Sequence, residues 1–223
     1  MSTSMTNTMP SAQSAIFATN RVIRNTYILL SMTLLFSALI AGVTMVLNLP
    51  HPALPLTLGS YFGLLFLTMK FCNRGLGLVF VFAFTGFMGY TLGPILSAYL
   101  TMPNGGQAVM TAMGATGATF IGLSGYVLAT RKEFSFMGGF LMVGILVAFL
   151  AGLGAVFFEI PGLSLVVSSM FVLLMAGLIL YETSNIIHGG ETNYIMATVT
   201  LYVSIFNLFS SLLHLLGFMN GDD

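Results

Sequence analysis

The sequence has almost no charge. Only 5% of its 223 residues are Asp, Glu, Lys or Arg, whereas a typical soluble domain carries about 25%. A chain with so few charges cannot cover its surface against water, so a soluble globular protein is excluded. Its six basic and six acidic residues cancel to a net charge of zero, which excludes the basic face that nucleic-acid binding requires.

The sequence also lacks a second cysteine and the common catalytic motifs, which limits the classes of function it can have. The chain has one cysteine, Cys72, so no disulfide can form within it. It also lacks a His-Glu zinc spacing, a Gly-x-Ser-x-Gly turn and a glycine-rich phosphate loop. We therefore expect no catalytic residues, no cofactor and no resident metal, and we interpret the chain as a non-enzymatic protein.

Apolar residues are what the sequence has in excess, at 57% of the chain with a mean hydropathy of +1.00. A membrane-spanning helix needs about 20 mostly apolar residues, and turn residues separate the apolar runs here. The sequence predicts an all-α membrane protein with a flexible tail over residues 1–25, a transmembrane domain over 26–219 and a short end over 220–223. The seven expected spans are Thr26–Leu47, Leu54–Phe71, Leu76–Ser97, Gln107–Ala129, Phe134–Phe158, Leu163–Ile187 and Tyr194–Met219.

The basic residues all fall on one side of this map. They precede the first span or lie between spans two and three or four and five, and they are Arg21, Arg24, Lys70, Arg74, Arg131 and Lys132. Basic residues stay on the cytoplasmic side of a membrane. We therefore expect the N-terminus in the cytoplasm and, after seven spans, the C-terminus outside.

The last span carries a polar stripe, whose members are Thr200, Ser204, Asn207, Ser211 and His214. They recur every three or four residues, so they share one face of a helix. Polar side chains within a membrane face protein or a water-filled cavity, and we expect this face to point inward. Ordinary interhelical hydrogen bonds, worth about 0.6 kcal/mol each, are the alternative to a hydrated cavity.

Glu182 interrupts the sixth span, about 9 Å from its cytoplasmic end at the rise of an α-helix. Its short side chain cannot reach water, so it should be protonated or paired. Lys70 and Arg74 lie at the matching depth. We hypothesise that Glu182 is a functional or gating carboxyl held by one of them. The alternatives are a structural pair and, for Lys70, a side chain that only extends to the membrane surface.

Four stretches of the chain resemble the Bax inhibitor / YccA family of seven-helix membrane proteins. They are "RNTYILLSMTLLFS", "FAFTGFMGYTLGPIL", "YVLATRKEFSFMGGFLM" and "ETSNIIHGGETNYIMATVTLYVSIFNLF". The last stretch is long and specific, and the resemblance extends from Arg21 to Phe218. It implies a bundle in which six helices surround a central seventh helix.

The resemblance is strongest to the bacterial YccA branch of the family. That branch implies a protein of the bacterial inner membrane with a periplasmic C-terminus. It implies binding and restraint of the membrane-embedded AAA protease FtsH, in a complex that includes the membrane-bound regulators of the protease. It also implies that the protease engages the chain through its cytoplasmic N-terminal tail.

A second branch of the family implies a different function, a pH-sensitive calcium leak. Its members carry facing aspartates on the sixth and seventh helices and an arginine latch on the second. The corresponding residues here are Glu182, Ser204 and Lys70, with Asn207 beside Ser204 on the polar stripe. Two close carboxyls share a proton, but a glutamate facing a serine has no such coupling. The resemblance therefore favours protease binding, and calcium enters only under the alternative.

Overall fold

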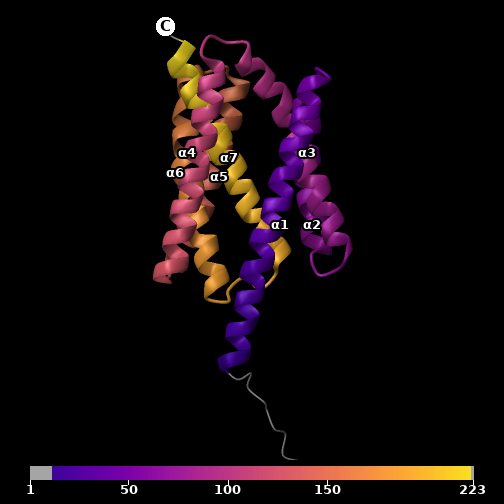
Figure 1. Ribbon diagram of the computed structural model, residues 1–223. Coiled ribbons are helices and arrows are strands. Elements are labelled where there is room, and N and C mark those ends of the chain that lie inside the picture. The colour runs from indigo at the N-terminus through magenta and orange to yellow at the C-terminus, as the bar shows by residue number, and fades with distance from the viewer. Residues whose placement is uncertain (1–11, 222–223) are drawn as a thin grey trace, which may run out of the picture.

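The described part of the chain, residues 12–221 of the computed structural model, contains helices and no strand (Figure 1). Seven of the helices are long and apolar enough to cross a membrane, which confirms the all-α prediction. They are α1 (Ala12–Val46), α2 (Leu54–Phe71), α3 (Leu76–Leu100), α4 (Gly105–Thr130), α5 (Gly138–Phe157), α6 (Pro161–Ile187) and α7 (Tyr194–Gly221), with a 3₁₀ helix, η1 (Ser135–Met137), before α5.

The first helix begins earlier than the sequence predicted. We expected a flexible tail before Thr26, but α1 is helical from Ala12 onward. The added segment is rich in alanine, which has the highest helix propensity, so the helix continues into the polar segment. Arg21 and Arg24 are therefore exposed residues of α1 itself. The remainder of the expected tail, residues 1–11, lies outside the described residues.

Helices α1 and α3 are packed with their backbones in direct contact. Gly89 and Gly93 of α3 lie against Ser37, Ala41 and Thr44 of α1. A Cβ atom at either glycine would collide with the α1 backbone or with the Thr44 hydroxyl. Small residues permit such close approach of helices in a membrane, so this glycine pair fixes the distance between α1 and α3.

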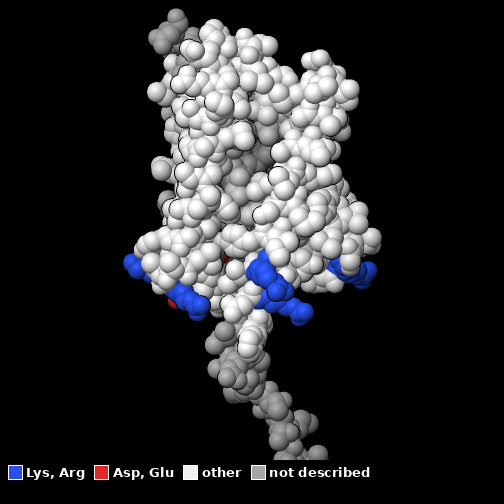
Figure 2. Space-filling model, viewed as in Figure 1, with Lys and Arg blue, Asp and Glu red and all other residues white. Residues whose placement is uncertain are grey.

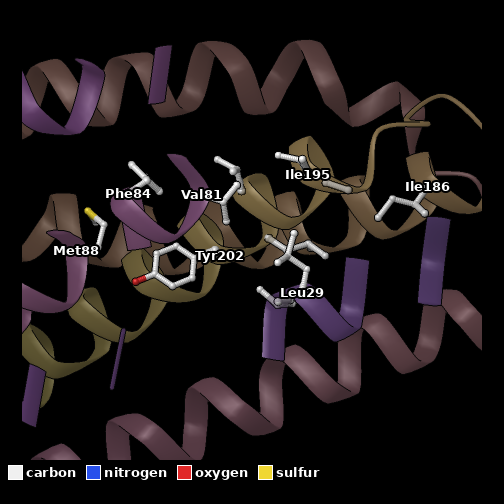
Figure 3. Close-up of a cluster of buried hydrophobic side chains, with 11 residues drawn as sticks. Leu29, Val81, Phe84, Met88, Ile186, Ile195 and Tyr202 are labelled. Carbon is white, nitrogen blue, oxygen red and sulfur yellow. The ribbon is translucent and has the colours of Figure 1, made fainter. Parts of the chain in front are cut away.

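Helix α7 contacts four other helices, α1, α3, α4 and α6. Half (50%) of the residues in its most apolar stretch are buried, which is the largest share among the seven spans. Residues of α7 belong to all three hydrophobic clusters. In the cluster of Figure 3, Tyr202 of α7 lies among Leu29 of α1 and Val81 and Phe84 of α3. Helix α7 therefore joins the first part of the chain to the last.

The basic side chains gather at one end of the bundle. Figure 2 shows Lys and Arg at the end where α1 begins, and none at the opposite end in this view. The basic residues that the sequence places on one side of the membrane therefore lie at one end of the folded bundle. We call this end the basic end.

Candidate functional site

Glu182 is buried inside the bundle, with only 4% of its surface exposed. Its neighbours along α6, Ile179 and Ile186, are fully enclosed. The Oε1 atom has no hydrogen-bond partner among the described residues. Because an ionised, unpaired carboxylate is strongly disfavoured in such surroundings, this group requires a proton, a water molecule or a cation.

The expected ion pair of Glu182 is absent from the described part of the chain, so that expectation was wrong. Lys70 and Arg74 are both exposed. Each places its charged group 6.0 Å from the centroid of the Phe71 ring. Helix α2 packs on α3, whereas α6 packs mainly on α4, α5 and α7 and touches α1. The two cations therefore belong to a different side of the bundle from Glu182 (Figure 1).

The polar stripe of α7 is largely enclosed. Two of its members are buried and three are partly buried: Ser204 and Ser211, then Thr200, Asn207 and His214. Ser204 Oγ donates to the Thr200 carbonyl at 2.8 Å. Asn207 Nδ2 donates to the Val203 carbonyl, also at 2.8 Å. These bonds stay within α7, and no hydrogen bond joins Ser204 to Glu182 in residues 12–221.

The far end of the stripe makes a contact between helices. His214 Nδ1 lies 2.8 Å from Ser168 Oγ of α6. Ser168 Oγ also lies 2.9 Å from the Ser164 carbonyl of its own helix. Here the stripe forms the interhelical hydrogen bond that was the alternative to a hydrated cavity.

A second buried polar junction escaped the sequence reasoning. The Tyr202 hydroxyl lies 2.6 Å from Ser37 Oγ of α1 and donates to the Thr85 carbonyl of α3 at 3.3 Å. One turn earlier on α7, Thr198 Oγ1 donates to the Tyr194 carbonyl of its own helix at 2.7 Å and also lies 3.3 Å from the Thr26 carbonyl of α1. These bonds connect three helices inside the apolar cluster of Figure 3. They fix α7 relative to the α1–α3 pair.

The loop between α6 and α7 is fastened to the α2–α3 turn by Asn193. Its Nδ2 donates to the Cys72 carbonyl at 3.3 Å and to Asn73 Oδ1 at 2.8 Å. Its Oδ1 accepts from the backbone N–H of Ile195 at 2.9 Å, at the start of α7. This one side chain therefore caps a helix and joins two connections at the basic end.

Within the described residues, no group of three His, Cys, Asp or Glu side chains is placed to hold a metal ion.

Comparison with known proteins assigns the fold to a family. The family model described as "Inhibitor of apoptosis-promoting Bax1" matches residues 19–221. The chain belongs to this Bax inhibitor family. It is 51% identical over 210 residues to "Modulator of FtsH protease YccA" of Escherichia coli, which covers 94% of this chain and 95% of that protein.

Other members of the family are also similar over most of their length. An uncharacterized protein of Pseudomonas aeruginosa is 54% identical over 202 residues, 91% of each chain. An uncharacterized membrane protein of Vibrio cholerae is 46% identical over 206 residues, 92% of each chain. A further Escherichia coli relative, 51% identical, is named an inner membrane protein. These findings confirm the resemblance to the Bax inhibitor / YccA family, in which one of these relatives is named a protease modulator and two are named membrane proteins.

Proposed function

We propose that the chain is an inner-membrane protein that binds the FtsH protease and lowers its action on membrane substrates. The observation that carries this proposal is the 51% identity to a modulator of FtsH protease over 94% of this chain and 95% of the relative. The similarity includes all seven helices, so it is not limited to one shared segment. The partners are the FtsH complex with its membrane-bound regulators and the bilayer. The role requires no catalytic residue and no cofactor.

The proposed architecture places α7 at the centre of the other six helices. Its support is the large buried share of α7, its contacts with four helices and its presence in every apolar cluster. Because the polar junction of Tyr202 and the stripe of Ser204 lie on this one helix, a partner that moved α7 would act on both. A central α7 would therefore be a suitable element for transmitting a regulatory signal.

The proposed orientation has the basic end in the cytoplasm, because cations resist translocation. We expect a reporter that is active only in the periplasm to be active when fused after Asp223. The same reporter inserted at Lys132, in the basic connection between α4 and α5, should be silent. Activity at Lys132 and silence after Asp223 would reverse the orientation.

The binding proposal is tested by crosslinking in native membranes. We expect FtsH to be recovered with the chain at its natural expression level. We also expect a membrane substrate of the protease to persist longer when the chain is present than when its gene is deleted. Unchanged substrate lifetime in the deletion strain would contradict the modulatory role, even if the two proteins were crosslinked.

Engagement through the N-terminus is a separate prediction. Deletion of residues 1–11 leaves every described helix intact, because α1 begins at Ala12. If the protease pulls on this terminal segment, the shortened chain should have a longer cellular lifetime in a pulse-chase measurement. An equal unfolding temperature for the two chains is the control for folding. An unaltered lifetime would contradict engagement of the protease through the N-terminal segment but would not contradict binding of the protease.

A calcium leak remains the second candidate, carried by one observation. The Oε1 atom of Glu182 is buried without a hydrogen-bond partner among residues 12–221, and carboxylate oxygens are ligands that Ca²⁺ prefers. Against a leak, Ser204 supplies no second carboxylate and donates its hydrogen bond within α7. The deciding measurement is calcium flux in vesicles. Strong flux through the unmodified chain that Glu182→Gln abolishes would favour the leak over protease binding.

A further inference from the structure

The connection between α4 and α5 contains an arginine in a backbone conformation that favours glycine. Arg131 has φ 51° and ψ 30°, in the left-handed region. Its N–H donates to the Val127 carbonyl at 2.8 Å and so ends α4. Glycine or asparagine usually occupies this position, because a side chain is strained there. Such strain often occurs at functional sites, so the question is what the guanidinium does.

A buried serine of α6 holds the connection between α4 and α5 in place. Ser184 of α6 is 1% exposed. Its Oγ accepts from the Phe134 N–H at 2.9 Å and donates to the Lys132 carbonyl at 3.3 Å. The backbone of the connection is thereby held against the end of α6. The side chains of Arg131 and Lys132 are both exposed, so two adjacent cations are displayed on a fixed backbone.

A ring contacts Lys132, and two further rings continue from it along the same connection. Lys132 Nζ lies 5.6 Å from the centroid of the Tyr126 ring, and Tyr126 raises the pKa of Lys132 through a side-chain hydrogen bond. The Tyr126 and Phe134 ring centroids are 6.4 Å apart, as are those of Phe134 and Phe136. Phe136 is 81% exposed. Exposed aromatic rings beside cations are typical of the boundary between membrane and water.

We propose that Arg131 and Lys132, together with the rings of Tyr126 and Phe136, bind the headgroup phosphate of an anionic phospholipid. A guanidinium presents paired donors that match phosphate oxygens, and the adjacent ammonium adds a point charge. Tyr126 lies in the last turns of α4 and Phe136 just before α5, where the rings contact the glycerol and the upper acyl chains. Anionic headgroups attract such basic residues at a membrane surface.

The remaining charge of the connection does not cancel the site. Glu133 is the acid between these cations and the aromatic residues, and its Oε1 accepts from Ser135 Oγ at 2.6 Å. Two cations therefore face one acid, and the net charge stays positive. An acidic protein segment would approach from water and would leave the exposed ring of Phe136 unused. The position of the rings therefore favours a lipid.

The test compares the unfolding temperature of the protein in nanodiscs of phosphatidylcholine with increasing phosphatidylglycerol. We expect the unmodified chain to gain stability as the anionic lipid increases. Arg131→Gly should show two opposite effects. It should be more stable than the unmodified chain in pure phosphatidylcholine, because glycine adopts the left-handed conformation without strain. It should gain less from phosphatidylglycerol, with binding about fivefold weaker for one lost cation.

Two variants and two soluble probes complete the test. Lys132→Gln should lose a similar part of the lipid-dependent gain but should not be more stable than the unmodified chain in pure phosphatidylcholine. Arg74→Gln removes a cation at the same end from a backbone without positive φ and should keep the full gain. Glycerol phosphate and an acidic peptide should not stabilise the unmodified chain in pure phosphatidylcholine discs. Arg131→Asn replaces Arg131→Gly if the glycine variant does not fold.

Three results would overturn the proposal. The first is a full phosphatidylglycerol gain in Arg131→Gly. The second is an equal loss in Arg74→Gln, which would indicate diffuse surface charge. The third is stabilisation by the acidic peptide or by glycerol phosphate that matches the lipid, which would assign the cations to a protein partner or to a soluble phosphate.

Discussion

Replacing Glu182 by methionine should raise the free energy of unfolding by about 1–3 kcal/mol, the cost of an unsatisfied buried polar group. The side chain is 4% exposed, and its Oε1 atom has no hydrogen-bond partner in residues 12–221. Methionine has a similar length and adapts its shape to an apolar site. Glu182→Gln keeps a polar group at this position, so it should raise the free energy of unfolding by less than Glu182→Met does. The measurement is reversible unfolding in mixed micelles.

Lys70→Met is the matched control for this prediction. Lys70 is exposed and forms no ion pair with Glu182 in the described part of the chain, so its replacement should change the free energy of unfolding by less than about 0.5 kcal/mol. A loss of about 3–5 kcal/mol in Glu182→Met would instead reveal a bound cation or another charge partner. If Lys70→Met lowered the free energy of unfolding by the same amount, the ion pair between Lys70 and Glu182 that the sequence predicted would have to form.

The same variant separates a structural role from a functional one. Functional sites often retain groups that destabilise the fold, so removing them gains stability and loses activity. A stabilised Glu182→Met variant that no longer prolongs the lifetime of an FtsH substrate would identify Glu182 as part of the regulatory mechanism. A stabilised variant with full activity would leave it without a regulatory role.

The positions of the helices were predictable because each transmembrane helix satisfies its own backbone hydrogen bonds. An apolar run therefore marks a span almost independently of its neighbours. Helix α2 extends over Leu54–Phe71, the range expected from the sequence. The start of α1 was missed because the expected boundary followed polarity, whereas the segment between Ala12 and Thr26 contains no glycine or proline that would end a helix.

The neighbours of each polar side chain could not be predicted in the same way. Depth along the membrane follows from residue number, but the angular position of a helix in the bundle does not. The sequence placed Lys70 at the depth of Glu182, but Lys70 belongs to a helix that packs on α3. The Ser204 hydroxyl bonds to its own helix, an option that a stripe of polar residues does not reveal.

A signal for the Tyr202 junction was nevertheless present in α1. Four hydroxyl residues of α1 recur at steps of seven, four and seven, a spacing that places them on one helix face. They are Thr26, Thr33, Ser37 and Thr44, and all four are buried. The Tyr202 hydroxyl contacts this buried face at Ser37, and Thr198 Oγ1 lies 3.3 Å from the Thr26 carbonyl. The partner residue on α7 required the structure.

The contact between α1 and α3 is where a single methyl group should have the largest effect on folding. At Gly89, an added Cβ would meet the Ser37 carbonyl oxygen and would lie 3.0 Å from the Ser37 carbonyl carbon and Cα. These are backbone atoms of a packed helix, and they cannot rotate away as a side chain can. Accommodating the methyl group would require α1 and α3 to separate, which would also stretch the Tyr202 junction between them.

Gly89→Ala should therefore lower the free energy of unfolding by about 1–3 kcal/mol or more, as overpacking does in a rigid core. Gly114→Ala on α4 is the matched control, because nothing lies within 4 Å of its added Cβ. The control should be neutral or slightly stabilising, since alanine favours a helix over glycine. Gly86→Ala should fall between them, because its Cβ would lie 2.9 Å from the ring of Phe36, a side chain that can move. Unfolding of the three variants in mixed micelles gives the order, and equal stability of Gly89→Ala and Gly114→Ala would contradict backbone contact between α1 and α3.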